Sequence, residues 1–405
     1  MPAPSTLPSA PHPVAAPARW RFALYAAHLL SGFAIAISNV LLALAVLAFP
    51  ALRSRPALPA SARRPALAAA VYLLALGAAI LASPEPLKSA RALSEVFSFA
   101  TFFLALAWVR GERQVRFLLD AAILIGALLA LSGLAQLAAG YGDIERRIRG
   151  PFSHYMTFAG CLLPFDLVLI ARLLTRRPDG GATGPTAWLD RPLVAWTALA
   201  AINLALAASL TRSAWLALAV SLAGLCVLVR PRLLAAAPVA AGLFLILAPV
   251  PMVGRALSIA DLADESNYDR VCMAEAGMRM VAERPLLGIG PDQVKRRYPI
   301  YRHPTAPRRT VPHLHNAYLQ VAAERGLPAL GALLALLGGS ALAAWRGHRR
   351  GGAGADLHLG VLAALAAFAV AALFENNWGD TEVQRYVLFL LAVPYALAAP
   401  AEQGE

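Results

Sequence analysis

Apolar stretches of about 20 residues, long enough to cross a lipid bilayer, recur along almost the whole chain. They lie near residues 22–49, 66–83, 90–109, 117–138, 155–171, 192–209, 214–229, 233–250, 317–345, 357–374 and 383–399. Charged residues fill only 15% of the 405 positions, against roughly a quarter in a soluble domain. The pattern therefore predicts an all-α integral membrane protein rather than several soluble domains.

The first apolar stretch, near 22–49, decides how many spans the chain has. It contains Ser31, Gly32, Ser38 and Asn39, so it can form one long tilted helix or two short helices with a tight turn. Two helices make twelve spans and place both termini on the same side of the membrane. Arginines support this number, because cytoplasmic loops carry an excess of Arg and Lys. With the N-terminus in the cytoplasm, every inner loop of a twelve-span chain is basic: 50–65, 110–116, 172–191, 230–232 and 346–350.

Three segments on the predicted outer side carry arginines that this rule does not favour. They are 145–149, with Arg146, Arg147 and Arg149; the turn around Arg212; and the long loop 253–312. Helix capping or ion pairs with acids of the loop can explain any one arginine of the long loop. Arg212 has no acidic neighbour in sequence, and an unpaired charge is costly at membrane depth. An anionic ligand would supply a partner, and the planar guanidinium suits phosphate.

The long outer loop predicts one helix, over 267–284, which contains Arg270 and ends before Pro285. A stripe of apolar residues at helical spacing predicts its buried face: Val271, Ala274, Met278 and Val281. We also expect a helix to begin near Pro312, because proline is tolerated in a first turn. Residues 314–325 then form a half-helix outside the membrane and 326–345 the following span, since Gly326 and Pro328 interrupt the apolar run.

His313 and His315 lie where this last helix is expected to begin. The positive end of a helix dipole lowers the pKa of a histidine and favours neutral imidazole, which can accept a proton near pH 7. Two other interpretations are a capping pair without chemistry and a metal site that also uses His303. No acidic or cysteine ligand lies at a suitable spacing for a metal. We therefore expect neither a metal nor a cofactor.

The pattern divides the chain into five parts. They are a disordered cytoplasmic tail (1–20), the first nine transmembrane helices (21–252), the outer loop with its helix and histidines (253–316), the last three transmembrane helices (317–399) and a short cytoplasmic tail (400–405). The first tail is rich in Pro and Ala and lacks the order of a signal peptide. The three cysteines suggest no disulfide framework, because Cys161 and Cys226 lie in apolar stretches.

Four segments resemble the O-antigen ligase family, within the wider group of polymerases and ligases that use polyprenyl-linked sugars. They are 315–326, with His-Asn, nine residues and then Gly; 209–215 (SLTRSAW); Arg270 followed by 285–290 (PLLGIG); and 149–154 (RGPFSH). The family's signature expects a small or hydroxylic residue soon after Gly326, where Ala329 and Gly331 are the candidates. The resemblance covers nearly the whole chain and implies a glycosyltransferase C-like fold of about twelve spans, with a large periplasmic loop between spans 9 and 10.

The resemblance implies a multi-pass enzyme of the bacterial inner membrane whose active site faces the periplasm. Such proteins transfer a glycan from undecaprenyl diphosphate to a sugar hydroxyl of lipid A-core, without a metal and with inversion. The expected partners are these two lipid-linked substrates and membrane lipids, with no nucleic acid. We expect the diphosphate at Arg146, Arg147, Arg149, Arg212 and Arg270, because fixed cations can stabilise a leaving group without a metal.

The base is expected to be His315 rather than His313, and both belong to the predicted catalytic set with Arg212. Residues two apart in a forming helix point about 200° apart, so the two histidines should not face the same acceptor oxygen. His315 also has the spacing of the family signature. Two other functions stay open: an O-antigen polymerase that joins repeat units, and a transporter of an anionic polyprenyl lipid. No internal repeat of the kind common in transporters is visible.

Overall fold

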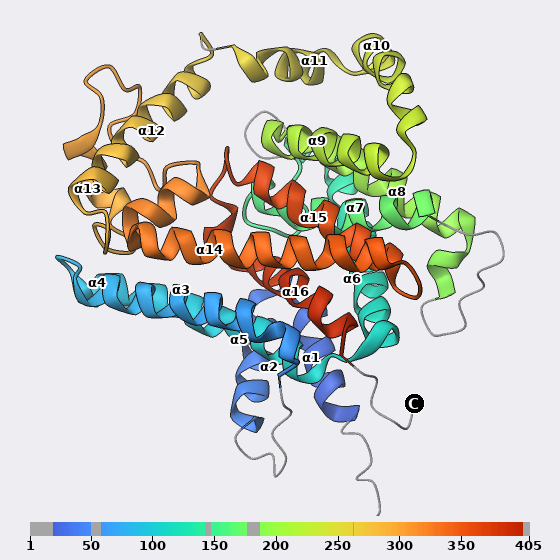
Figure 1. Ribbon diagram of the computed structural model, residues 1–405. Coiled ribbons are helices and arrows are strands. Elements are labelled where there is room, and N and C mark those ends of the chain that lie inside the picture. Colours follow the sequence, from blue (N-terminus) through green and yellow to red (C-terminus); the bar gives the residue numbers. More distant parts are fainter. Residues whose placement is uncertain (1–18, 50–57, 142–146, 176–186, 262, 400–405) are drawn as a thin grey trace, which may run out of the picture.

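The computed structural model describes residues 19–49, 58–141, 147–175, 187–261 and 263–399. Over these residues the protein is all-helical and contains no strand (Figure 1). Residues 1–18 of the first predicted tail, the second predicted tail, Arg146 and several arginines of the inner loops lie outside the described residues. The prediction that the first tail extends to residue 20 is wrong, because a helix already begins at Arg19. The all-α prediction is thus confirmed for the described chain.

Each predicted apolar stretch contains a helix. The bundle consists of α1 (Arg19–Leu30), α2 (Ile35–Ala48), α3 (Arg63–Leu81), α5 (Leu93–Trp108), α6 (Gly111–Ala138), α7 (Tyr155–Thr175), α8 (Pro192–Ala208), α9 (Arg212–Val229), α10 (Ala237–Leu247), α14 (Ala317–Arg350), α15 (Ala355–Ala371) and α16 (Thr381–Leu397). The first stretch forms two helices, with a turn at residues 31–34, as the two-helix interpretation predicts.

Six of these helices are long and apolar enough to cross a membrane. They are Ala60–Leu81, Pro86–Trp108, Gly111–Ala138, Tyr155–Thr175, Arg212–Val229 and Ala317–Arg350, and four shorter apolar helices accompany them. Large apolar side chains on the outside, such as Leu74 of α3 at 74% exposure, are those expected to face lipid. The composition and helix lengths support a multi-pass membrane protein, and the number of twelve spans stays a prediction.

The core of the bundle is formed by α7, α15 and α16. The helix α7 packs against α15, which also packs against α9 and α14, and α16 packs against α5. The middle of α7 is apolar and fully buried, from Phe158 to Leu169, with Asp166 as its one carboxylate. The helix α16 also packs against α7, and the first turn of α7 lies beside the start of α16 at the site.

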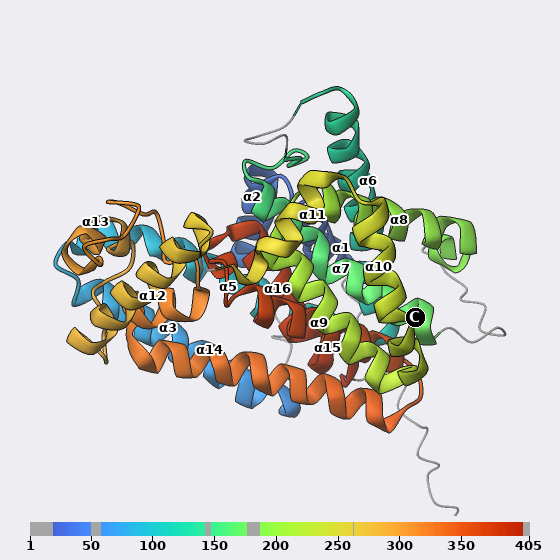
Figure 2. The ribbon, with the colours of Figure 1, turned by 90° about the horizontal axis from the view of Figure 1, so that it is seen from above.

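The remaining helices form a lobe at the N-terminal end of α14, which both ribbon views show (Figures 1 and 2). The lobe contains α12 (Glu265–Glu283) and α13 (Val294–Tyr301), and α11 (Val250–Leu257) leads into it. The predicted helix of the long loop is therefore present. Its predicted buried face is wrong: Val271 and Met278 are more than half exposed, whereas Met273, Ala276 and Met280 are buried. The two stripes lie on different faces of one helix, and only the partner in space decides which is covered.

The lobe is joined to α14 where that helix is broken at Gly326. Gly326 has a φ of 83° and a ψ of 169°, and a Cβ there would lie 2.1 Å from the carbonyl oxygen of Leu286. The Ile289 amide donates to the Ala323 carbonyl over 2.8 Å, and the Leu327 amide donates to the Pro285 carbonyl over 2.7 Å. The predicted interruption of the run is confirmed. The glycine is required because a neighbouring backbone occupies the space of a side chain.

Candidate active site

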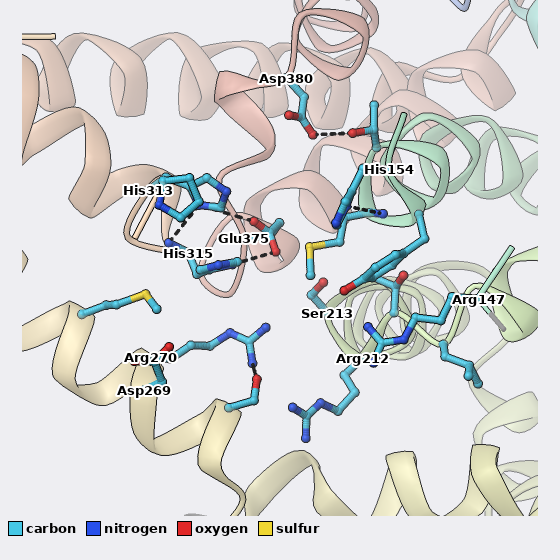
Figure 3. Close-up of a pocket in the computed structure, with 18 of the residues that line it drawn as sticks. Arg147, His154, Arg212, Ser213, Asp269, Arg270, His313, His315, Glu375 and Asp380 are labelled. Carbon is cyan, nitrogen blue, oxygen red and sulfur yellow. Dashed lines mark hydrogen bonds and ion pairs between the residues drawn. The ribbon is translucent and has the colours of Figure 1, made fainter. Parts of the chain in front are cut away.

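One pocket of about 770 Å³ gathers most of the residues that the sequence singles out (Figure 3). It lies between the first turns of α7 and α9, the start of α12, the segment before α14 and the connection from α15 to α16. Arg147, Arg212, Arg270, His313 and His315 all line it. Arg149 does not line it; its guanidinium instead donates to the Ser153 carbonyl over 2.9 Å.

A buried glutamate, Glu375, brings the two histidines together. Its Oε2 lies 3.0 Å from Nδ1 of His315, and its Oε1 lies 3.8 Å from Nδ1 of His313. The backbone amide of His315 donates to Nδ1 of His313 over 3.3 Å. The two imidazole ring centroids are 4.3 Å apart. Because Nδ1 of His313 accepts a hydrogen bond, any proton on this ring in the neutral form lies on Nε2.

The expectation that the two histidines point in opposite directions is wrong. It assumed that both lie in a helix, but α14 begins only at Ala317, with Asn316 as its N-cap and its side chain accepting from the Leu319 amide over 2.9 Å. His315 adopts a left-handed conformation, with a φ of 49°. Such a conformation is uncommon for a non-glycine residue and persists where the surrounding structure holds it. The turn places both imidazoles against one carboxylate.

The electrostatics of this group favour a neutral histidine beside an ionised glutamate. Burial, which outweighs the charge of Glu375, lowers the pKa of His313 to about 4. Burial would raise the pKa of Glu375, but the hydrogen bond from His315 acts against burial, and the pKa lies below its usual range. A carboxylate that accepts from Nδ1–H of an imidazole leaves Nε2 as the proton acceptor. His315 is therefore held in the tautomer that a general base requires.

Arg212 begins α9, directly after Leu210, which has a φ of 51°, and Thr211. The inference that it lacks an acidic partner is wrong. Its two terminal nitrogens each lie 3.3 Å from an oxygen of Asp264, and Nη1 also donates to Oγ of Ser258 over 2.9 Å. Asp264 is the N-cap of α12, so the folded loop brings the partner from a distant part of the sequence. The pair is fixed at the wall of the pocket.

Arg270 lines the pocket without an ion pair to a carboxylate among the described residues. Its Nη1 donates to Oγ of Ser266 over 3.1 Å, and among the described residues no carboxylate lies within ion-pair distance. Its buried Nε has no partner in the described part of the chain. Burial lowers the pKa of Arg270, although arginine stays charged. Arg147 is held differently, with its guanidinium 4.6 Å from the centroid of the Tyr155 ring.

The same cluster has the ligand types of a metal site. One atom each from His313, His315 and Glu375 lie within 4.8 Å of one another. The sequence argument against a metal rested on the lack of an acidic ligand, and that reason is wrong because Glu375 supplies one. His303 does not join the cluster; its Nδ1 contacts Oγ1 of Thr305 at 2.6 Å. Two imidazoles and a carboxylate can bind zinc, and the effect of a chelator on activity tests whether this cluster does so.

Glu375 is a pocket residue that sequence reasoning did not connect with the histidines. It lies 60 residues beyond His315, and no spacing rule connects the two. A signal existed, because a carboxylate directly after an apolar stretch is costly near a membrane unless it has a partner. The apolar stretch 357–374 ends directly before Glu375.

A second, more apolar pocket of about 290 Å³ adjoins the first. The two share Arg212, Ser213, Arg270 and His315. The rest of its lining is mainly apolar, with Leu216, Val271, Ala274, Leu314 and Phe374. The exposed Val271 of α12 thus lines the wall of this pocket and does not lie on the buried face of the helix.

These features define a polytopic membrane protein with a histidine–carboxylate pair and an arginine-lined pocket beside an apolar one. Residues 195–334 match the family model of the O-Antigen ligase, and this match contains Arg212, Arg270, His313 and His315. The resemblance to the O-antigen ligase family is thereby confirmed, and the family supports a glycan ligase or polymerase function in general terms. No curated protein is similar enough to the chain to serve as a relative.

Proposed function

We propose that the protein is an O-antigen ligase of the bacterial inner membrane. It would transfer a glycan from undecaprenyl diphosphate to a sugar hydroxyl of lipid A-core on the periplasmic face, with inversion and without a metal. One observation carries the proposal: a single pocket holds the His315–Glu375 pair and the guanidinium groups of Arg147, Arg212 and Arg270. The pair suits proton abstraction, and the arginines suit an anionic leaving group.

In this mechanism Nε2 of His315 accepts the proton of the acceptor hydroxyl. The hydroxyl oxygen forms a bond to the anomeric carbon of the glycan as the bond from that carbon to the diphosphate oxygen breaks. The electron pair of the broken bond leaves with undecaprenyl diphosphate. Glu375 stabilises the imidazolium that forms, because it accepts from Nδ1 over 3.0 Å.

The arginines stabilise the charge that develops on the diphosphate. Arg270 is the strongest candidate for direct contact, since no carboxylate is paired with it among the described residues. Arg212 presents a guanidinium fixed by Asp264, and a fixed cation needs no rearrangement during the reaction. Arg149 does not line the pocket, and its guanidinium donates to the Ser153 carbonyl. We therefore assign Arg149 to stabilising the segment before α7.

The apolar second pocket suits the first isoprene units of the donor. It opens from the arginine wall, where the diphosphate would lie, and shares Arg270 and His315 with the larger pocket. A polyprenyl chain needs such an apolar surface directly beside its charged group.

The test incubates the purified protein with polyprenyl-diphosphate glycan and lipid A-core and measures the joined product. We expect ligation to continue in excess EDTA, because the arginines take the role of a metal at the diphosphate. Loss of ligation in EDTA, with recovery on adding a divalent ion, contradicts the metal-free mechanism. Product that contains only lengthened polyprenyl-linked glycan identifies a polymerase. Binding of the donor without any transfer supports a transporter.

A further inference from the structure

The pocket has a second polar end, formed by Asp380 and Thr157. Asp380 precedes α16, and Thr157 lies in the first turn of α7. The Thr157 hydroxyl donates to Oδ2 of Asp380 over 3.0 Å. Both residues line the pocket, together with His154. Figure 3 shows Asp380 at the end of the pocket away from Arg212 and Arg270.

Asp380 does not perform the structural task that its position offers. It is the N-cap residue of α16, where aspartate normally accepts hydrogen bonds from the backbone amides of the first turn and stabilises the helix. Its side chain makes no such capping bond. It turns instead to Thr157, and its second oxygen has no hydrogen bond among the described residues. That oxygen is available to a ligand in the pocket.

The charge at this end disfavours a phosphate and suits sugar hydroxyls. Asp380 brings a carboxyl group to the end of the pocket away from Arg212 and Arg270, and Glu375 lies between Asp380 and these two arginines, so a diphosphate would meet negative rather than positive charge there. Burial and the charges of Glu375 and Glu382 raise the pKa of Asp380 to about 7, while the bond from Thr157 opposes the shift. A carboxyl group, a threonine hydroxyl and an imidazole offer the donors and acceptors that a hydroxyl-rich ring requires.

Inverting displacement places the attacking oxygen and the leaving group on opposite sides of the anomeric carbon. If the diphosphate lies at the arginine wall, the acceptor sugar lies toward Asp380. We infer that Asp380 binds a hydroxyl of the acceptor sugar and positions that sugar ring for His315. This inference rests on the proposed function. The acceptor is then a sugar without phosphate next to the reacting hydroxyl.

The test measures the kinetics of Asp380→Asn, which keeps the size of the side chain and the capping ability of the position. A hydrogen bond to a charged group corresponds to roughly a 10–100-fold change in binding. We expect the KM for lipid A-core to rise by that factor while the KM for the polyprenyl-linked donor stays unchanged. The matched control is Glu275→Gln, which makes the same type of change at a partly exposed acid of α12 that does not line the pocket. It should leave both KM values unchanged.

Three results would overturn the inference: an unchanged acceptor KM, a rise in the donor KM alone, or an equal rise in both. If Asp380→Asn does not accumulate as a folded protein, Asp380→Glu keeps the acid but moves it by one methylene, and the same acceptor-specific effect is expected. Direct binding of lipid A-core without donor separates this inference from the proposed function. A wild-type protein that binds lipid A-core but ligates nothing contradicts the function, and equal binding by wild type and Asp380→Asn contradicts the inference.

Discussion

At the residue scale, the candidate site depends on contacts between distant parts of the chain. His315 and Glu375 are 60 residues apart and meet at 3.0 Å. Arg212 meets Asp264 at 3.3 Å across the start of α12. Both His315 and Leu210, two residues before Arg212, have positive φ angles of 49° and 51°. Strained backbone at two corners of one pocket indicates that the surrounding fold holds these side chains in place.

The first prediction concerns the base. His315→Ala should lower the single-turnover rate of ligation by roughly 10²–10⁴-fold while donor binding persists, because the arginines remain. His313→Ala should lower it less, since Nδ1 of His313 accepts from the His315 amide and supports the turn. Rates measured with donor already bound compare the two variants. A large loss in His313→Ala with little change in His315→Ala would reverse the assignment.

The second prediction separates the two arginines. Arg270→Lys and Arg212→Lys keep the charge but lose the planar guanidinium. We expect the weaker donor binding in Arg270→Lys, because Arg270 has no carboxylate partner among the described residues and Arg212 is paired with Asp264. Binding of polyprenyl diphosphate to each folded variant checks this. Near-normal ligation by Arg212→Lys would make Arg212 a structural residue, and normal donor binding by Arg270→Lys would remove Arg270 from the diphosphate site.

At the element scale, the break in α14 connects the lobe to the bundle. The segment 285–290 runs across the helix at Gly326, and backbone hydrogen bonds join Ile289 to Ala323 and Leu327 to Pro285. Beside this joint, the buried Arg325 forms ion pairs with Glu324 and with Glu95 of α5. This arrangement gives a physical reason for the glycine of the signature. The helix must open there to receive another segment's backbone.

The third prediction tests this joint. Gly326→Ala places a Cβ 2.1 Å from the Leu286 oxygen and forces alanine into a conformation that costs roughly 1–3 kcal/mol by itself. We expect a lower thermal unfolding midpoint of the detergent-solubilised protein and reduced ligation. The control is Gly331→Ala in the same helix, where a Cβ meets nothing within 4 Å. Equal midpoints for the two variants would show that the joint does not stabilise the fold.

At the scale of the whole molecule, the distribution of arginines predicts on which side of the membrane the pocket lies. The joint and the pocket lie at one end of α14, and the loop at residues 351–354 lies at its other end. Basic residues precede that loop, so the positive-inside rule predicts that the loop lies in the cytoplasm and the pocket in the periplasm.

The fourth prediction is that a cysteine at Thr310 reacts with an impermeant thiol reagent in intact cells, whereas a cysteine at Ala353 reacts only after lysis. Both positions are exposed, and neither residue is needed by the site. The native Cys161, Cys226 and Cys272 are buried and should give little background. The opposite labelling pattern would invert the topology and contradict a periplasmic active site.

The sequence by itself determined the helices and their class, because about 20 apolar residues in a row have few alternatives to a buried or lipid-facing helix. It also indicated the histidines and most of the arginines of the pocket, since cations on the outer side and a proline–histidine segment are local signals. Periodicity could not choose between Met273 and Val271 as the buried face of α12, as both stripes are apolar.

Only the tertiary structure decided which charges meet. Three acids reach the pocket from different parts of the fold: Glu375 from the connection between α15 and α16, Asp264 from the start of α12, and Asp380 from the start of α16. No short-range sequence rule links these acids to His315 or Arg212. Helix geometry predicted that His313 and His315 diverge, but the N-cap at Asn316 starts the helix after them, and both face Glu375. The physical reason is that helices form from neighbouring residues, whereas a site forms wherever packing brings polar side chains to a common cavity.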